Sequence, residues 1–474
     1  MILKINIFLS FKLKEYYNIY KDQKDFFSSK KTFPISFRIN SLKRLKSNII
    51  KYENQIFKAL NDDLGKSEAE TYFSEISLLY NEINLALKNI KKWSSKKRIS
   101  SSLINFLSTD YILPEPYGTI LNISPWNYPF QLAISPIIGA VAAGNTVVLK
   151  PSEYSENTSK LLKKIINESF DKRHVSVVLG GPEVGSNLLD LKWDYIFFTG
   201  STQIGKIVAK KAAEHLTPTT LELGGKNPCI IDESVNLNVA VKRIVWGKFL
   251  NCGQTCIAPD FILCHKNNKD EFISLLINRL KKIYNSDAYN SSNYSKIISS
   301  KHVERLKDLM NNNNIIYGGN YNIKTKFFEP TIVEIENHKT KLLEEEIFGP
   351  ILPIIEFKNE SELYKILSFY KNPLAFYVFT NRKKFGEKLM KDFSFGGGAI
   401  NDTIGQIVNH RLPFGGIGDS GQGKYHGKES FNTFSHFKPY IIKSKFLDLN
   451  FKYKVDEKSF SFRIMKKIFR YISV

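Results

Sequence analysis

The segment of residues 251–260 reads Asn-Cys-Gly-Gln-Thr-Cys-Ile-Ala-Pro-Asp and holds two of the four cysteines. Glycine, small polar residues and a following proline predict an irregular turn, in which Cys256 is a candidate nucleophile. A thiolate attacks a carbonyl carbon when a base or a lowered pKa activates it. The chain should therefore also supply a carboxylate or histidine and a hydrogen-bond donor for the developing oxyanion.

Glu222 is the candidate base. It lies in the sequence Leu-Glu-Leu-Gly-Gly-Lys-Asn-Pro at residues 221–228, where flanking leucines leave its carboxylate poorly solvated. Poor solvation raises the pKa of a carboxylate toward the range in which it can take a proton from water. The alternative is a half-buried structural acid held by a lysine such as Lys226, and this motif by itself does not separate the two interpretations.

A turn with the sequence Pro-Trp-Asn-Tyr-Pro at residues 125–129 directly follows a predicted strand. Two prolines fix the backbone on either side of one amide, which aims a hydrogen-bond donor rigidly at an oxyanion. Asn127 is therefore the candidate donor. Alternatively, its side chain caps the helix that follows, and the turn considered alone favours that interpretation.

Two further segments at predicted strand ends suit a dinucleotide. In Lys150-Pro-Ser-Glu153, the lysine and the acid could hold ribose hydroxyls; an acid there favours NAD over NADP, and the lysine could offset that preference. In residues 198–206, Phe-Thr-Gly-Ser-Thr-Gln-Ile-Gly-Lys, a strand meets a turn and a helix whose free N–H groups suit a pyrophosphate. The second segment is not the Gly-x-Gly-x-x-Gly fingerprint, and residues 152–153 could simply begin a helix.

Alternating strands and helices must position these groups. Apolar residues recur every three or four positions through residues 37–93, which predicts long amphipathic helices. Residues 111–123 read as strand, with Pro114, Pro116 and Gly118 marking an edge or hairpin. Strands and helices alternate after this point, which predicts parallel βαβ units with ligands at the carboxyl ends of the strands. The predicted strands are 119–124, 146–150, 175–179 and 195–199, and the predicted helices are 130–143, 156–170 and 205–213.

The composition of the chain limits the number of domains, the classes of partner and the compartment that we expect. A chain of 474 residues with 42% apolar residues predicts two or three globular domains. The formal charge of +22 comes from lysines spread along the whole sequence, which indicates a diffusely basic surface and no nucleic-acid site. Four cysteines crowded into one region indicate a reducing compartment, with the cytoplasm as default. We expect no metal, because paired zinc-knuckle spacing is missing from Cys252, Cys256, Cys264 and His265.

The two ends of the chain carry amphipathic patterns. The first ten residues are apolar but interrupted by Lys4 and Asn6, and they lack a cleavage site, which favours a helix over a signal peptide. We expect no membrane span, because no run of eighteen apolar residues occurs. Residues 460–472 predict a basic amphipathic helix that could lie on an anionic membrane. Docking of this helix on the protein itself or on a partner subunit is the favoured alternative.

Taken together and in this order, the motifs resemble the NAD(P)-dependent aldehyde dehydrogenase superfamily. Later segments point to its class 3 branch, whose members oxidise fatty and aromatic aldehydes. The resemblance covers about residues 22–450. The later segments are Glu-Glu-Ile-Phe-Gly-Pro at 345–350, Gly-Ala-Ile-Asn-Asp-Thr at 398–403, Leu-Pro-Phe-Gly-Gly at 412–416 and Tyr-His-Gly-Lys at 425–428.

The resemblance implies a role for each matching residue. Cys256 is the nucleophile, Glu222 activates the water that hydrolyses the thioester, and Asn127 forms the oxyanion hole together with the Cys256 backbone N–H. The cofactor is NAD, possibly NADP in its place. The implied cofactor-binding residues are Trp126, Lys150, Glu153, Gly200, Ser201, Thr202, Gln203, Ile204, Gly205, Glu346 and Phe348.

The implied reaction has three steps. The Cys256 thiolate adds to the aldehyde, hydride passes to the nicotinamide, and water attacks the resulting thioester with Glu222 as base. An acylating, coenzyme-A-dependent dehydrogenase is one alternative, which Glu222 argues against because such an enzyme needs no base for water. A catalytically idle NAD-binding or structural module is the other, and the intact set of candidate catalytic residues argues against it. Cys252 is interpreted as a bystander.

The resemblance also implies an α/β fold with a Rossmann-type NAD(P)-binding domain, an α/β catalytic domain and a small bridging sheet for oligomerisation. Members of this branch are typically dimers, so we expect a homodimer. Residues 1–21 exceed the usual start and are a misassigned initiation site, a disordered arm or an extra helix. The implied division is extension 1–21, NAD(P)-binding 22–95 and 117–224, catalytic 225–410, bridging 96–116 and 411–450, and basic tail 451–474.

Overall fold

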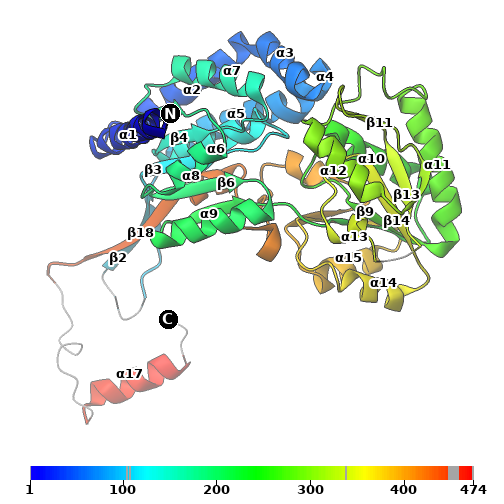
Figure 1. The fold of residues 1–474 in the computed structure, drawn as a ribbon. Coiled ribbons are helices and arrows are strands. Elements are labelled where there is room, and N and C mark those ends of the chain that lie inside the picture. The colour runs from blue at the N-terminus through cyan, green and yellow to red at the C-terminus, as the bar shows by residue number, and fades with distance from the viewer. Residues whose placement is uncertain (1, 103–104, 106–107, 337–338, 447–457, 472–474) are drawn as a thin grey trace.

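The computed structural model describes residues 2–102, 105, 108–336, 339–446 and 458–471. Two mainly parallel β-sheets form the cores of two lobes that lie side by side, and a small antiparallel sheet projects away from them (Figure 1). The predicted α/β architecture is confirmed. Parts of the predicted bridging segments and of the basic tail lie outside the described residues.

The first lobe contains a six-stranded sheet in the order β17-β7-β6-β3-β4-β5. Its neighbouring strands pair in parallel, except that β17 pairs antiparallel with β7. Because β17 comes from residues after 411, a segment that was expected to form only the bridging sheet also contributes to the sheet of the first lobe. The strands are β3 (Thr119–Ile123), β4 (Thr146–Lys150), β5 (Val175–Val177), β6 (Tyr195–Thr199), β7 (Thr219–Glu222) and β17 (Gly421–Gln422).

Helices cover both faces of this sheet. Val147 and Leu149 of β4 belong to the hydrophobic core on one face, and Val148 belongs to the core on the other. A strand buried on both faces reads as a continuous apolar run, as β4 does. The first face is covered by α2 (Ile35–Lys51), α3 (Glu53–Leu64), α5 (Ser77–Trp93), α6 (Gln131–Ala143) and α7 (Glu156–Ser169), and the second by α1 (Ile2–Ser28), α8 (Pro182–Leu189) and α9 (Thr202–Glu214).

The second lobe contains a seven-stranded sheet in the order β10-β13-β14-β9-β8-β15-β16, in which β10 alone pairs antiparallel. Two separate hydrophobic cores lie on its two faces. The strands are β8 (Pro228–Ile231), β9 (Phe261–His265), β10 (Asn314–Tyr317), β13 (Thr331–Glu334), β14 (Ile351–Phe357), β15 (Ala375–Phe379) and β16 (Gly397–Ile400). The helices are α10 (Leu237–Phe249) and α11 (Lys269–Ile283) on one face, and α12 (Ser300–Met310), α14 (Glu360–Leu367) and α15 (Lys383–Asp392) on the other.

The third sheet joins β1 (Lys97–Ile99), β2 (Ser108–Pro116) and β18 (Ser435–Lys443). Strand β2 lies in the middle and pairs antiparallel with both neighbours, and β18 pairs with it over nine residues. Chain segments more than three hundred residues apart therefore meet here. The sheet extends beyond both lobes (Figure 1), and β18 leaves Phe437, Ile441 and Ile442 exposed.

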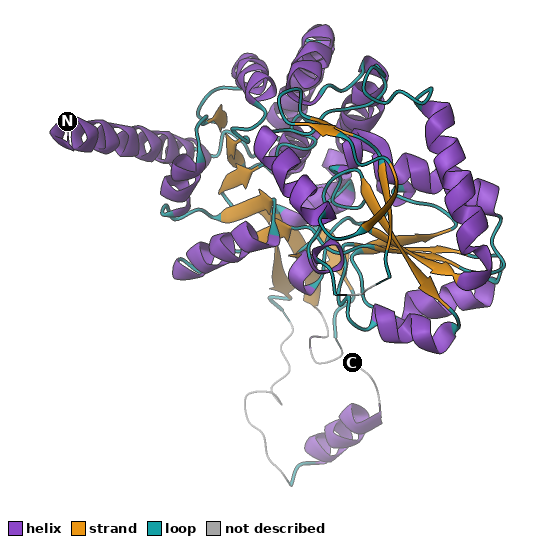
Figure 2. Cartoon of the chain, turned by 45° about the vertical axis from the view of Figure 1, so that its right-hand side comes forward, coloured by secondary structure: helices purple, strands orange, loops and turns teal. Residues whose placement is uncertain are grey.

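The N-terminal segment forms one long helix, α1 (Ile2–Ser28), so the extra-helix interpretation of residues 1–21 is the one the structure supports. Its C-terminal part packs on the first lobe: Tyr16 is buried, and the Tyr20 hydroxyl donates to the Lys192 carbonyl oxygen (2.7 Å). Its N-terminal end extends away from the body (Figure 2). No helix within the described part of the chain has the length and apolar character to cross a membrane.

Most predicted elements are present, with informative errors. The strand pattern of residues 111–123 is interrupted at Gly118, one of the residues expected to mark an edge or hairpin: the chain turns there at φ 145°, and β2 and β3 belong to different sheets. Helix α9 begins before the predicted residue 205, because Ser201 caps it by accepting a hydrogen bond from the Ile204 N–H (3.4 Å). Helix α8 was not predicted, since its short apolar pattern resembles a loop.

Candidate active site

The candidate site is one cavity of about 1300 Å³ between the two lobes. Three candidate catalytic residues and nearly all candidate cofactor residues line it, although they come from six separate segments of the chain. Only Gly205 of the predicted site residues does not line the cavity. Those that do are Trp126, Asn127, Lys150, Glu153, Gly200, Ser201, Thr202, Gln203, Ile204, Glu222, Cys256, Glu346 and Phe348.

The topology of the first sheet explains this convergence. The Pro-Trp-Asn-Tyr-Pro turn follows β3, Lys150 ends β4, Gly200 follows β6 and Glu222 ends β7. Because these strands are parallel neighbours, their carboxyl ends meet at one edge. The helix N-terminus of α9 lies at the same edge.

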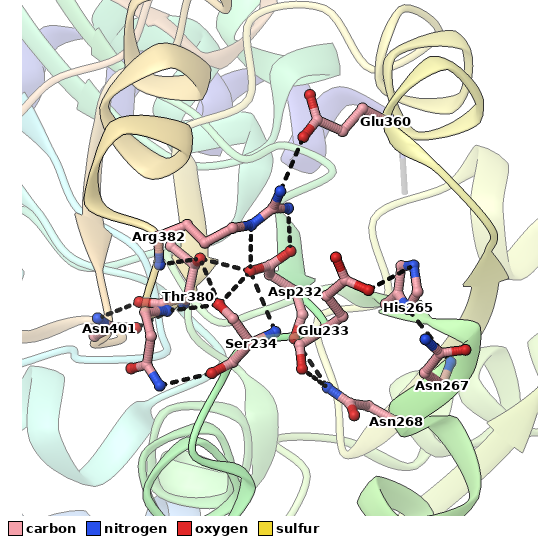
Figure 3. A network of polar contacts seen from close by, with 11 residues as sticks. Asp232, Glu233, Ser234, His265, Asn267, Asn268, Glu360, Thr380, Arg382 and Asn401 are labelled. Carbon is pink, nitrogen blue, oxygen red and sulfur yellow. Dashed lines mark hydrogen bonds and ion pairs between the residues drawn. The ribbon is translucent and has the colours of Figure 1, made fainter.

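The carboxyl ends of the second sheet are closed by the protein's own polar groups (Figure 3). Asp232, which follows β8, accepts hydrogen bonds from Ser234 Oγ (2.6 Å) and Thr380 Oγ1 (2.7 Å) and forms an ion pair with Arg382. Asn401, which follows β16, donates to the Thr380 carbonyl oxygen (2.8 Å). These groups at the ends of β8, β15 and β16 therefore satisfy one another, whereas the Glu222 carboxylate at the edge of the first sheet has no hydrogen-bond partner among the described residues.

Cys256 lies at the boundary between the two lobes, after β7, β8 and α10 in the chain. Burial raises the pKa of its thiol to about 12, and the nearby carboxylates of Glu346 and Glu222 act in the same direction. The backbone N–H groups of Cys256 and Ile257 face the sulfur and oppose that rise. The same two N–H groups can therefore stabilise negative charge that develops beside the sulfur.

The thiol pKa predicts the pH dependence of Cys256 reactivity. Because the thiolate is the reactive form and its pKa lies above neutrality, alkylation by iodoacetamide should accelerate about tenfold per pH unit from pH 7 to 9. We would measure it on the cofactor-free protein, with peptide mass spectrometry to separate Cys256 from the buried Cys229, Cys252 and Cys264. A rate that is flat above pH 7 would contradict this expectation.

Glu222 is 2% exposed, and burial raises the pKa of its carboxyl well above the usual range, as predicted. Neither carboxylate oxygen has a hydrogen-bond partner among the described residues. The alternative pairing with Lys226 is wrong, because Lys226 Nζ contacts Asp260 and donates to the Glu345 carbonyl oxygen (3.0 Å). Glu222 is thus a buried, uncommitted acid in the same cavity as the thiol.

Asn127 does not cap the following helix, which has no side-chain cap at its N-terminus. Its side-chain Nδ2 donates to the Gln254 carbonyl oxygen (3.0 Å), two residues before Cys256. A side-chain amide carries two N–H donors, so one remains for an oxyanion. This hydrogen bond fixes Asn127 to the turn that carries the nucleophile.

Tyr128 and Thr255 lie beside the candidate catalytic residues and were not predicted from the sequence. Tyr128 Oη and Thr255 Oγ1 lie 2.6 Å apart.

Cys252 does not line the cavity. Its thiol is buried and donates to Tyr294 Oη (3.3 Å), and burial raises its pKa to about 12. Cys252 therefore has its own partner outside the active-site cavity, as expected of a bystander.

The dinucleotide end of the cavity has groups suited to phosphate and ribose. Residues 200–204 bring the N-terminus of the thirteen-residue helix α9 to the cavity wall. Lys150 Nζ forms an ion pair with Glu153 (2.6 Å) at the end of β4. Gly205 faces away, and a Cβ there would lie 2.5 Å from Leu223 Cδ2, so this glycine lets α9 pack closely and does not contact a ligand directly.

Glu346 and Phe348 reach the cavity from the second lobe. Glu346 accepts a hydrogen bond from the Gly225 N–H (3.2 Å), and burial raises its pKa to about 7. Phe348 has φ 48° and its ring lies 5.3 Å from that of Trp126 in an edge-on arrangement. The donors and acceptors of both lobes fit a nicotinamide dinucleotide placed between them.

Large apolar side chains form part of the remaining wall of the cavity. Phe73, Trp246 and Val408 line the cavity although they are 72%, 50% and 57% exposed. Leu132 and Leu250 also contribute. Sequence reasoning missed these residues because they lie on separate helices and turns, with no shared motif to connect them.

Comparison with known proteins identifies the family. The model of the aldehyde dehydrogenase family matches residues 12–439. The chain is 45% identical over 429 residues to 4,4'-diaponeurosporen-aldehyde dehydrogenase of Staphylococcus aureus, with 90% of this chain and 94% of the relative covered. It is 42% identical over 418 residues to aldehyde dehydrogenase family 3 member A2 of Pongo abelii, with 88% and 86% covered.

Solved structures agree. Staphylococcus aureus AldH in its substrate-bound state matches with a TM-score of 0.93 and 43% sequence identity, covering 96% of this chain and 99% of that chain. The predicted fold class, family and oxidoreductase activity are confirmed by these matches. The chain therefore belongs to the class 3 branch of the aldehyde dehydrogenase family, whose members oxidise aldehydes to carboxylic acids with NAD(P).

Proposed function

We propose that the protein oxidises a long, apolar fatty or aromatic aldehyde, with Cys256 as nucleophile, Asn127 as oxyanion donor and Glu222 as general base. The observation that carries the proposal is the single cavity of about 1300 Å³. It connects a thiol, an uncommitted buried acid and an amide donor with a polar dinucleotide end and an apolar end. A cavity with this division suits one charged cofactor and one apolar substrate.

In the acylation half of the reaction, the Cys256 thiolate attacks the aldehyde carbon. The resulting alkoxide receives hydrogen bonds from the free Asn127 amide N–H and from the Cys256 backbone N–H. Each donor contributes about 3 to 4 kcal/mol if it behaves like a typical oxyanion-hole donor. When bound, the cofactor supplies the acceptor for the hydride that leaves the former aldehyde carbon.

In the deacylation half, Glu222 takes a proton from the water that attacks the thioester on Cys256. Burial raises the pKa of its carboxyl well above the usual range, which makes its carboxylate a stronger base than that of an exposed glutamate. Attack by water releases the carboxylic acid and restores the thiolate. An acylating enzyme that uses coenzyme A would need no such base, and an idle module would need no uncommitted buried acid.

The apolar end of the cavity supports a long substrate. Phe73, Trp246 and Val408 leave large apolar surfaces uncovered there, and such surfaces mark sites for apolar ligands. The similarity to an enzyme named 4,4'-diaponeurosporen-aldehyde dehydrogenase agrees with this inference. On the cofactor side, Glu153 favours NAD, and Lys150 offsets that preference enough to keep NADP as a second cofactor.

Two proposals concern partners. The exposed Phe437, Ile441 and Ile442 of β18 offer an apolar edge for a homodimer, which Ile441→Asp should dissociate in analytical ultracentrifugation. Helix α17 (Phe460–Tyr471) exposes Lys466 and Lys467 and could contact an anionic membrane. Sedimentation with phosphatidylserine vesicles, but not with phosphatidylcholine vesicles, and its loss in Lys466→Glu/Lys467→Glu would support that contact.

We place the protein in the cytoplasm, in keeping with its four free cysteines.

The proposed function is tested by following NADH and NADPH formation with acetaldehyde, benzaldehyde and hexadecanal. We expect turnover in the absence of coenzyme A and a kcat/KM that increases from acetaldehyde to the two apolar aldehydes. Turnover only after addition of coenzyme A would support the acylating alternative. A folded protein that is silent under every condition would support the idle module.

A further inference from the structure

The backbone just before the nucleophile adopts an unfavourable conformation over three consecutive residues. Asn251, Cys252 and Gly253 have φ angles of 52°, 54° and 72°, all in the left-handed region. Glycine is needed at the last of these, because a Cβ would lie 2.3 Å from the Gly349 carbonyl oxygen. Asparagine tolerates this region moderately and cysteine poorly, so the surrounding structure must hold the turn in place.

Glu70 is the side chain that reaches this turn from the other lobe. It lies on the short helix α4 (Glu68–Thr71), which Ser67 caps by accepting a hydrogen bond from the Glu70 N–H (3.2 Å). Its Oε1 accepts a hydrogen bond from the Asn251 backbone N–H (2.7 Å). Its Oε2 accepts one from Ser295 Oγ (2.8 Å). One carboxylate therefore connects the first lobe to two segments of the second.

The Asn251 side chain connects this turn to Asn127, the proposed oxyanion donor. Its side-chain Nδ2 donates to the Asn127 carbonyl oxygen (2.7 Å) and to the Gln254 carbonyl oxygen (3.1 Å). The Asn127 side chain donates to the same Gln254 carbonyl oxygen (3.0 Å). The oxyanion donor and the residues that lead to Cys256 are thus hydrogen-bonded into one unit, and Glu70, which also lines the cavity, holds that unit from the first lobe.

We infer that Glu70 is a positioning residue: it holds the left-handed turn at residues 251–253 and thereby sets the placement of Cys256 relative to Asn127. This inference rests on the proposed roles of Cys256 and Asn127. The function assigned to Glu70 requires a hydrogen-bond acceptor at Oε1 and a partner for Ser295 at Oε2, and it does not require a charge. Glutamine can satisfy both contacts, since Ser295 Oγ can accept from its amide, whereas alanine satisfies neither.

The test compares Glu70→Ala, Glu70→Gln and the control Glu68→Ala, an exposed acid on the same helix. We would measure kcat, KM, the alkylation rate of Cys256, the affinity for the cofactor and Tm. Glu70→Ala should lower kcat and the alkylation rate by about 10- to 100-fold, since displacement of a reacting group by about 1 Å has effects of this size. Cofactor affinity should stay within about twofold, and Glu70→Gln should retain kcat within about threefold of wild type.

Asn251→Gly serves as a second variant if Glu70→Ala does not fold. It keeps the left-handed backbone and the N–H that Glu70 accepts, but it removes the amide that reaches Asn127. We expect it to lower kcat at least tenfold with cofactor affinity unchanged. Full kcat in Asn251→Gly, or in folded Glu70→Ala, would overturn the inference, as would a Glu70→Gln variant as impaired as Glu70→Ala. If wild type turns over and Cys256→Ala does not, these failures would leave the proposed function standing.

Discussion

Cys256→Ala is expected to lower aldehyde oxidation by at least about four orders of magnitude, because without the thiol no covalent intermediate can form. Glu222→Gln is expected to behave differently. The thiol in that variant still attacks the aldehyde, but the thioester accumulates because no base takes the proton of the attacking water. Rapid-mixing measurement of reduced cofactor should therefore show at most one burst turnover per site, followed by a very slow steady state.

The control for these variants is Cys264→Ala, which removes a buried thiol of β9 that does not line the cavity. It should keep wild-type turnover if it folds. Mass spectrometry of Glu222→Gln after the burst should find the acyl group on the peptide that contains Cys256. Steady turnover by Glu222→Gln, or an acyl group on another residue, would contradict the assigned roles.

Lys66→Met is expected to lower the free energy of unfolding by about 3 to 5 kcal/mol, the usual effect of removing one partner from a buried ion pair. Lys66 Nζ lies 2.6 Å from Glu75 Oε1, and both side chains are 0% exposed. Removal of the lysine leaves the Glu75 carboxylate buried without its counter-charge. Lys66 Nζ also donates to the Asn127 carbonyl oxygen (3.0 Å), so kcat should fall as well.

Urea denaturation and kcat measurement on Lys66→Met, Glu75→Gln and the double variant would separate these effects. The double variant should be more stable than Lys66→Met, because no unpaired charge remains. Its kcat should stay low, because the Asn127 carbonyl oxygen still lacks the lysine. The control Lys58→Met breaks an exposed pair with Asp62 (3.2 Å) and should not change stability measurably. Equal stability of Lys66→Met and wild type would show that the pair is not coupled to folding.

The nucleophile, base and oxyanion donor could be proposed from the sequence because each lies in a local motif, and the combination of motifs decided between interpretations that single motifs left open. Glycines and prolines around Cys256 and Asn127 reveal irregular backbone, and leucines around Glu222 reveal a desolvated acid. The alternation of strands and helices predicted that β3, β4 and β6 are parallel, and therefore that the motifs meet at the carboxyl ends of these strands. These features depend on neighbours in the sequence, so the sequence by itself determined them.

Tertiary structure decided the contacts between distant segments. The ion pair of Lys66 with Glu75, the hydrogen bond from Asn251 to Glu70 and the apolar cavity wall at Trp246 have no local signature. Local patterns marked a break near Gly118, but only the fold assigns β2 and β3 to different sheets. The physical reason is that a buried charge or a left-handed turn is stable only beside the particular partner that folding brings to it. A cavity wall or a sheet likewise forms only when distant segments pack together.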